Sequence, residues 1–343
     1  MTKKHEHHFI RLFFLIFVLV PITSFCALTK INYPTLFLTE ISSWSMDSCQ
    51  PWRISDKQIS EINPIGSMIG EDESRFLFWL GANYFKGIGK ILDLGPLAGG
   101  STYSLANGVQ HNIKVYSKDQ VIYSYDLWSF WDSWGVFFPN KIIRQGQDIL
   151  PFFIENLANF HNMVIPQKGN LLNAKWDETP IEIIFIDAAK TPQLMEHIVN
   201  EFYPMLIPGH SLVLQQDFIS AECPWIHIIQ EHLSDYFEIM DSPEGGTVCF
   251  RIIRQIPANI LRDNFYSSLN PHEAISLIEN AANRLKGWNR LCVLLAKAHY
   301  LALIGEGYEA RRVFNAVLED KEYDPSVEFD INMINRILCE ANS

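Results

Sequence analysis

The chain has 343 residues, of which 48% are hydrophobic and 19% charged, and this balance excludes an intrinsically disordered protein. Its formal net charge is −12 at pH 7, so no nucleic-acid partner is expected, because binding a phosphate backbone needs a basic surface. The 6 cysteines are scattered without a C-x-x-C pair, which predicts neither a zinc site nor a redox motif and leaves the compartment open.

The N-terminus combines a basic segment with an apolar run. Lys3, Lys4 and Arg11 precede residues 12–28, which are almost entirely apolar. This order is typical of a secretory signal, and the run also reaches the lower limit of ~17–25 residues for a membrane-spanning helix. We expect membrane association through residues 12–28, with the rest of the chain outside the cytoplasm. The alternative is translation from Met46, which would leave the protein cytoplasmic.

The next part of the chain changes from a linker to alternating strands and helices. Residues 29–56 show no sustained period and are expected to form a linker, and a 3.6-residue period predicts a helix over Asp72–Phe85. Strands are expected at Lys90–Leu94, Val121–Tyr125, Met163–Pro166, Ile181–Ile186, Ser211–Leu214, Phe237–Met240 and Thr247–Ile253, and further helices at Gly100–Gly108, Ile149–Phe160, Gln193–Tyr203 and Ala221–Leu233.

This order predicts the fold class. Short apolar strands separated by helices indicate a doubly wound α/β fold with a mostly parallel sheet of seven strands. The last two strands are joined by residues 241–246, a Gly/Pro-rich turn too short for a crossover helix. Strands joined so tightly must be antiparallel, so we expect the sheet to end in an antiparallel hairpin.

The C-terminal part, residues 256–343, is expected to be a separate all-α region. The strand pattern stops after Ile256, and residues 271–340 have a helical period. Small residues within 296–318 resemble those of a tetratricopeptide helix pair, although about three such units are normally needed for a stable array. We therefore expect a helical appendage that packs on the main domain or mediates contact with a protein partner or a second copy.

A glycine-rich turn is the most specific motif. In residues 91–102 an apolar strand carries Asp93 near its end, turns through Gly95 and Gly99, and enters a helix at Gly100-Ser101. Such a turn lets backbone N–H groups approach a ligand at the carboxyl edge of a doubly wound sheet. The spacing is not the G-x-G-x-x-G of dinucleotide sites, and no P-loop lysine follows.

The motif resembles motif I of class I S-adenosylmethionine methyltransferases, with a spacing similar to that of the catechol, caffeoyl-CoA and macrolide O-methyltransferases. The resemblance covers residues 65–255, within a methyltransferase domain expected over residues 57–255. It implies S-adenosylmethionine as the cofactor. By the same resemblance the cofactor-binding residues are Asp93, Gly95, Gly99, Ser101, Asp126 and Asn170, with Asp126 accepting from the ribose hydroxyls and Asn170 near the adenine. The alternative for Asp126 is a strand-end turn aspartate.

A second motif suggests the reaction centre. Asp187 and Lys190 follow a buried strand with the D-x-x-K spacing of the divalent-metal-dependent O-methyltransferases, and Asp217 follows the next strand. The resemblance implies that Asp187 and Asp217 bind Mg²⁺ and that Lys190 is the catalytic base, with Asp187 also at the catalytic centre. Phe218 stands where these relatives commonly have an asparagine ligand, which makes the metal site incomplete. The alternatives are helix-capping aspartates and a solvated lysine.

An aromatic stretch follows Asp126. Its members are Trp128, Phe130, Trp131, Trp134, Phe137 and Phe138. They could form a lid over the site, or they could pack on the sheet edge or against the C-terminal helices.

The function expected from these features is S-adenosylmethionine-dependent methyl transfer to a hydroxyl of a small molecule or sugar. The alternative is a non-catalytic methyltransferase fold that binds a protein partner. The glycine spacing disfavours a nicotinamide oxidoreductase. One conflict remains, because S-adenosylmethionine is cytosolic whereas the N-terminal charge bias places the domain outside.

Overall fold

The computed structural model describes residues 50–54, 57–139, 141–261, 264–323 and 328–340. The apolar run at residues 12–28 lies outside the described residues. Within the described ranges, no helix is long and apolar enough to cross a membrane.

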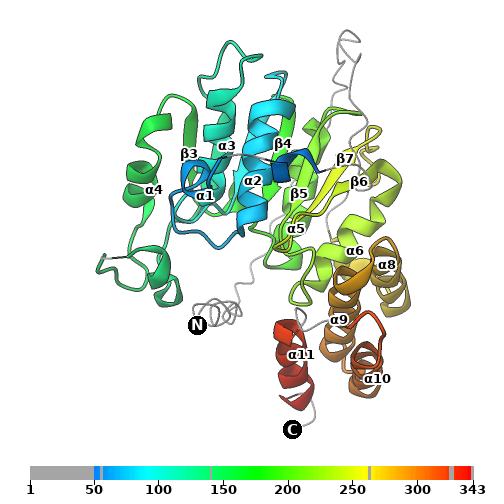
Figure 1. Cartoon of the computed structure of the whole chain (residues 1–343). Helices are drawn as coiled ribbons and strands as arrows, with labels where there is room; N and C mark the ends of the chain where they lie inside the picture. Colours follow the sequence, from blue (N-terminus) through cyan, green and yellow to red (C-terminus); the bar gives the residue numbers. More distant parts are fainter. Residues whose placement is uncertain (1–49, 55–56, 140, 262–263, 324–327, 341–343) are drawn as a thin grey trace.

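One sheet organises the molecule (Figure 1). Its strands are β1 (Lys90–Leu94), β2 (Ile122–Asp126), β3 (Val164–Lys168), β4 (Ile181–Ile186), β5 (Leu212–Gln215), β6 (Phe237–Asp241) and β7 (Val248–Ile252), in the order β3-β2-β1-β4-β5-β7-β6. Neighbours from β3 to β5 are parallel, whereas β7 is antiparallel to both β5 and β6. The expected seven-stranded, mostly parallel sheet with a terminal hairpin is therefore confirmed.

The strands form where short apolar runs can be buried on both faces. All six residues of β4 are buried. Ile184 and Ile186 belong to one hydrophobic core, while Ile183 and Phe185 belong to the core on the opposite face, as the period of two in a strand requires.

Helices cover both faces of the sheet (Figure 1). They are α1 (Ile59–Ile62), α2 (Glu71–Trp79), α3 (Gly100–His111), α4 (Leu150–Asn156), α5 (Pro192–Phe202), α6 (Pro224–His232), α7 (Phe265–Ser268), α8 (Pro271–Asn283), α9 (Gly287–Leu303), α10 (Gly307–Leu318) and α11 (Glu328–Glu340). Buried residues of α2, α3 and α4 join one core, and those of α5 and α6 join the other.

The helix expected over Asp72–Phe85 differs from the observed one. The α-helix ends at Trp79, and Leu80–Tyr84 forms a π-helical turn. The Asn112 side chain donates to the carbonyls of Gly81 (2.9 Å) and Phe85 (2.7 Å), so it satisfies backbone groups that a regular helix end leaves open. A side chain distant in sequence therefore determines how this helix ends.

The C-terminal helices pack on the sheet domain beside α6 (Figure 1). Ile278 of α8, Val293 of α9 and Ile334 of α11 belong to the same buried cluster as Ile228 of α6. These helices therefore share a hydrophobic core with one face of the sheet, which agrees with the first of the two packing alternatives.

The end of the expected linker has structure. Pro51–Ile54 forms a short 3-10 helix, and the Trp52 side chain is buried. Its indole Nε1 donates to Asp241 Oδ2 at 3.0 Å, so this segment is attached to the end of β6.

The strand order creates a natural ligand position. From β1 the chain proceeds outward to β2 and β3 and then returns to place β4 on the other side of β1. The loops that leave β1 and β4 therefore diverge, and in doubly wound sheets ligands bind in the crevice at such a switch point.

Candidate active site

A cavity of about 340 Å³ lies at the carboxyl ends of the parallel strands. The carboxyl ends of all five strands and the segments after them line it. They include Gly95–Leu97 after β1, Asp126 at the end of β2 and Leu127 after it, Asn170 and Leu171 after β3, Asp187 after β4 and Asp217 after β5. Its volume lies within the ~300–1,000 Å³ typical of small-molecule sites. The switch point of the sheet therefore coincides with a cavity.

Asp126 lies on one wall of the cavity. Its carboxylate accepts from the backbone N–H groups of Leu97 (3.1 Å) and Trp128 (2.7 Å). Burial raises the pKa of Asp126 above its ordinary value, and these backbone N–H groups oppose that rise. Asn170 also lines the cavity, and its Oδ1 accepts from the backbone N–H of Leu172 at 3.0 Å.

The glycine turn brings the ends of β1 and β4 together. Gly95 has φ +94°, and a Cβ atom there would lie 2.8 Å from the carbonyl oxygen of Asp187. Only glycine fits this close contact without distortion. Gly99 also has a left-handed φ of +101°, but it faces the Phe153 side chain and does not line the cavity.

Asp93 lies behind the cavity rather than on its wall. It is completely buried, and its Oδ2 accepts from Ser101 Oγ (2.8 Å) and Thr102 Oγ1 (2.5 Å) at the start of α3. Among the described residues, none donates to Asp93 Oδ1. Burial raises the pKa of Asp93 to about 7, against the lowering effect of the two hydroxyls. Asp93 therefore organises the turn, while Ser101 reaches the cavity.

Lys190 lies between two carboxylates on the opposite wall. Its Nζ donates to Asp187 Oδ1 at 2.8 Å and to Asp217 Oδ2. Burial acts to lower the pKa of Lys190, but Asp187 and Asp217 outweigh it and hold this pKa well above the ordinary value. An ammonium so stabilised stays protonated at neutral pH, so the geometry does not suit Lys190 to the expected role of a base.

Asp217 takes an unusual backbone conformation. Its φ is +61°, which costs a non-glycine residue roughly 1 kcal/mol. The next residue, Phe218, is buried and packs against Phe250 and His227. Phe218 therefore belongs to the core and does not replace the missing asparagine ligand.

The donor set does not fit the expected Mg²⁺ site. Asp187 and Asp217 both bind the Lys190 ammonium, which occupies the space between them and neutralises half of their charge. The side-chain oxygen of Gln216, the residue before Asp217, already accepts a hydrogen bond from Thr247 Oγ1. Within the described ranges, no group of three or more His, Cys, Asp or Glu side chains could hold a metal ion. The magnesium prediction is therefore not supported.

The aromatic stretch divides between core and cavity. Trp128, Phe130 and Phe138 are buried in the core that covers one sheet face. Trp131 and Trp134 line the cavity, with ring centroids 6.5 Å apart. Packing therefore accounts for the buried members, whereas a lid formed by Trp131 and Trp134 stays a prediction.

Sequence reasoning did not find several lining residues. Gly66–Ile69, just before α2, cover part of the cavity, and Leu194 and Glu222 also line it. No local pattern distinguishes them, although Glu222 closely follows Asp217 in the same loop.

No family model matches the chain, and no curated protein sequence matches it. Solved methyltransferase structures are similar to it. An SAH-bound methyltransferase of Podospora anserina is 12% identical, with a TM-score of 0.37 over 53% of this chain and 78% of that one. The phosphoethanolamine N-methyltransferase 1 of Haemonchus contortus is 11% identical, with a TM-score of 0.38 over 68% and 54%. A methyltransferase of Streptomyces caelestis is 13% identical, with a TM-score of 0.29 over 44% and 51%. Similarity at this level does not identify a reaction.

Proposed function

We propose that the chain is an S-adenosylmethionine-dependent methyltransferase that transfers a methyl group to a hydroxyl of a small molecule. The main support is the cavity at the switch point, which has the glycine turn and Asp126 on one side and Asp187, Lys190 and Asp217 on the other. Methyl transfer requires the cofactor and the methyl acceptor to be held next to each other in one cavity, and these two walls could each bind one of them.

The chemistry of the lining residues fits the cofactor. Backbone N–H groups hold the Asp126 carboxylate in place, and a carboxylate has about four acceptor positions, so it can still accept from a ribose hydroxyl. Of the lining residues that the structure describes, only Lys190 is basic, whereas Asp126, Asp187, Asp217 and Glu222 are acidic. Such a wall favours a ligand with positive charge.

S-adenosylmethionine supplies a methyl group that is bound to a positively charged sulfur. When the methyl group is transferred, this sulfur becomes a neutral thioether in the leaving S-adenosylhomocysteine. The residues of this chain then have to orient the acceptor and take its proton. Asp217 and Asp187 can accept a hydrogen bond from the acceptor hydroxyl, and Lys190 fixes both carboxylates. A hydroxyl becomes strongly acidic as its oxygen forms the new bond to carbon, so a carboxylate suffices as the proton acceptor. The role given to Lys190 is therefore positioning.

The proposal is tested by following the methyl group. The full chain is incubated with S-adenosylmethionine labelled in the methyl group and with fractionated small-molecule extracts, and labelled products are separated by chromatography. We expect label in at least one hydroxyl-bearing product, and we expect Asp217→Asn to reduce its formation, because the amide cannot take the proton. Asp148→Asn, which alters an exposed carboxylate outside the cavity, is the matched control.

Transfer to products by the Asp217→Asn variant at the unaltered rate would contradict the assigned role of this residue. Cofactor binding without transfer in any fraction would favour a non-catalytic protein.

A further inference from the structure

The loop from residue 216 to 223 connects β5 to α6. Some of its residues line the cavity, and others are buried. Gln216, Asp217 and Glu222 of this acceptor-side loop line the cavity. Ser220 and Ala221 in its middle are almost completely buried, with exposures of 1% and 0%. The contacts of the buried residues Ser220 and Ala221 therefore determine where the cavity-lining residues of the loop lie.

The backbone of the loop is bound by side chains of the C-terminal helices. Asp330 of α11 is 4% exposed, and its Oδ1 accepts from the backbone N–H of Ala221 at 2.9 Å and from Ser220 Oγ at 3.5 Å. His299 Nδ1 of α9 lies 2.9 Å from the carbonyl oxygen of Ala221, and because a carbonyl can only accept, this nitrogen carries the proton. Both polar backbone groups of Ala221 are therefore satisfied from the C-terminal helices.

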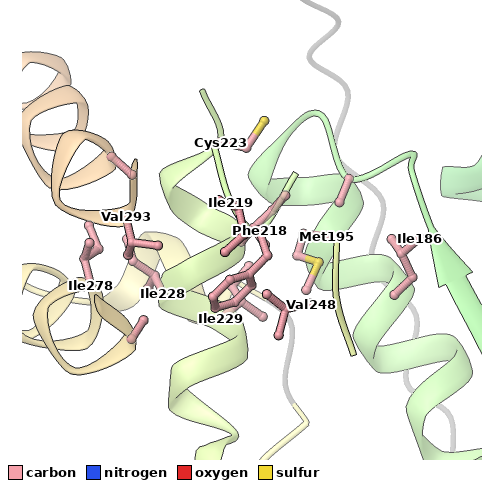
Figure 2. Close-up of a cluster of buried hydrophobic side chains, with 14 of the residues drawn as sticks. Ile186, Met195, Phe218, Ile219, Cys223, Ile228, Ile229, Val248, Ile278 and Val293 are labelled. Carbon is pink, nitrogen blue, oxygen red and sulfur yellow. The ribbon is translucent and has the colours of Figure 1, made fainter. Parts of the chain in front are cut away.

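Apolar packing supports the same contact. Figure 2 shows Phe218 and Ile219 beside Ile228 and Ile229 of α6, with Val293 of α9 on the outer side of α6. The C-terminal helices bind the buried backbone groups of the loop and share a hydrophobic core with its apolar side chains. The loop therefore cannot move independently of α9 and α11.

The consequence reaches the cavity through Asp217. This residue is held at φ +61°, an unfavourable conformation that persists only where surrounding contacts determine it. Its carboxylate binds Lys190, which in turn binds Asp187. A shift of the loop would therefore separate the members of the carboxylate–lysine–carboxylate group.

We propose that Asp330 and His299 are positioning residues of the active site, through which α9 and α11 hold the acceptor-side loop so that Asp217 contacts Lys190 and the methyl acceptor. The contact with the methyl acceptor depends on the proposed function, whereas the contact with Lys190 does not. The C-terminal helices are then part of the catalytic scaffold and not merely attached to it.

The first test measures opening of the loop by thiol labelling. Cys223 is buried at the end of the loop, and Cys249 is buried in β7 in the core on the other sheet face, so Cys249 reports global unfolding. Losing a buried hydrogen bond should increase local opening about tenfold. In Asp330→Ala we expect faster labelling of Cys223, mapped by mass spectrometry, with Cys249 unchanged.

Conservative and distant variants serve as controls. Asp330→Asn retains an oxygen that accepts from Ala221, and His299→Asn retains an N–H donor at nearly the same place, so both should label more slowly than the corresponding alanine variants. Asn332→Ala changes an exposed residue of α11 and should behave as the unaltered protein. Equal labelling of Cys223 in Asp330→Ala and the unaltered protein would overturn the proposal.

The second test distinguishes positioning from a purely structural role. Acylation of a lysine requires the neutral amine, so Lys190 between its carboxylates should react slowly with an N-hydroxysuccinimide ester, whereas the exposed Lys175 reacts as an internal reference. In Asp330→Ala we expect about tenfold faster acylation of Lys190 relative to Lys175. Faster labelling of Cys223 without any change at Lys190 would contradict positioning and leave only a structural role.

Binding of S-adenosylhomocysteine separates this proposal from the proposed function. We expect Asp330→Ala to bind it as the unaltered chain does, because the backbone groups that hold Asp126 belong to Leu97 and Trp128, which lie outside the loop. If the unaltered chain does not bind it, the proposed function fails, while the labelling results still decide whether Asp330 positions Asp217.

Discussion

Replacing Gly95 by alanine tests whether the contact between the ends of β1 and β4 shapes the cavity. Gly95 has φ +94°, so any other L-residue there is strained by roughly 1–2 kcal/mol. The new Cβ would also lie 2.8 Å from the Asp187 carbonyl oxygen and 3.0 Å from its carbonyl carbon. Both are backbone atoms, so the chain itself must move, at a further cost of about 1–3 kcal/mol.

Gly99→Ala is the matched control. It carries the same backbone strain at φ +101°, but its Cβ would meet the Phe153 ring at 3.2 Å, a side chain that can shift. We therefore expect Gly99→Ala to lose roughly 1–2 kcal/mol of unfolding free energy and Gly95→Ala about 2–5 kcal/mol. Because only the Gly95 substitution displaces Asp187, it alone should weaken S-adenosylhomocysteine binding, by about tenfold or more.

The assay is urea unfolding of both variants, followed by calorimetric titration with S-adenosylhomocysteine. Equal unfolding midpoints in the two variants, with unaltered affinity in Gly95→Ala, would refute the reasoning, because the contact with Asp187 would then have no effect on the cavity.

Three further outcomes are expected. Asp126→Ala should weaken S-adenosylhomocysteine binding about 10- to 150-fold by calorimetry, since hydrogen bonds to charged groups contribute about 1.5–3 kcal/mol; unaltered affinity would exclude contact with the cofactor. Because the pKa of Asp93 is raised to about 7 in the folded state, the unfolding free energy should fall by on the order of 4 kcal/mol as pH rises from about 4 to 7. Urea unfolding of Asp93→Asn should lack this loss. An identical pH profile in the variant would count against a buried, proton-binding Asp93. Lys190→Met should lower the unfolding free energy by about 2 kcal/mol at pH 7, less than the 3–5 kcal/mol of a fully buried pair because Lys190 is 31% exposed. An unaltered unfolding free energy in this variant would contradict the assigned charges.

The sheet could be predicted from the sequence because each strand is a short apolar run bounded by turn residues. The residues at the carboxyl edge of the sheet could be predicted as well, since residues that end neighbouring parallel strands must lie at the same edge. The sequence therefore predicted Asp126, Asp187 and Asp217 at one edge of the sheet, and all three line the cavity. The glycine turn predicted a close approach of the backbone to a ligand, but not the contact of Gly95 with the Asp187 carbonyl.

The side-chain arrangement within that space could not be predicted in the same way. Whether Lys190 lies between the two carboxylates or points to solvent depends on packing around the loops, which no local period encodes. The resemblance favoured a metal between Asp187 and Asp217, and the observed ammonium takes that place.

Long-range contacts were the other limit. Ala221 and Asp330 are 109 positions apart, so the bond between them leaves no pattern in either segment. The helical period of residues 271–340 predicted the C-terminal helices, but it could not show that they bind the loop that carries Asp217.

A shift in thermal unfolding on adding the cofactor is the most direct test of whether this chain binds S-adenosylmethionine. Thermal unfolding of the full chain is measured with S-adenosylmethionine, S-adenosylhomocysteine or NAD. A ligand at 100 times its Kd adds about 2.7 kcal/mol, which for a folded unit of roughly 300 residues corresponds to a rise of about 4 °C in Tm. We expect this rise with both sulfur ligands and none with NAD. No rise with either sulfur ligand, at concentrations up to the millimolar range, would contradict it.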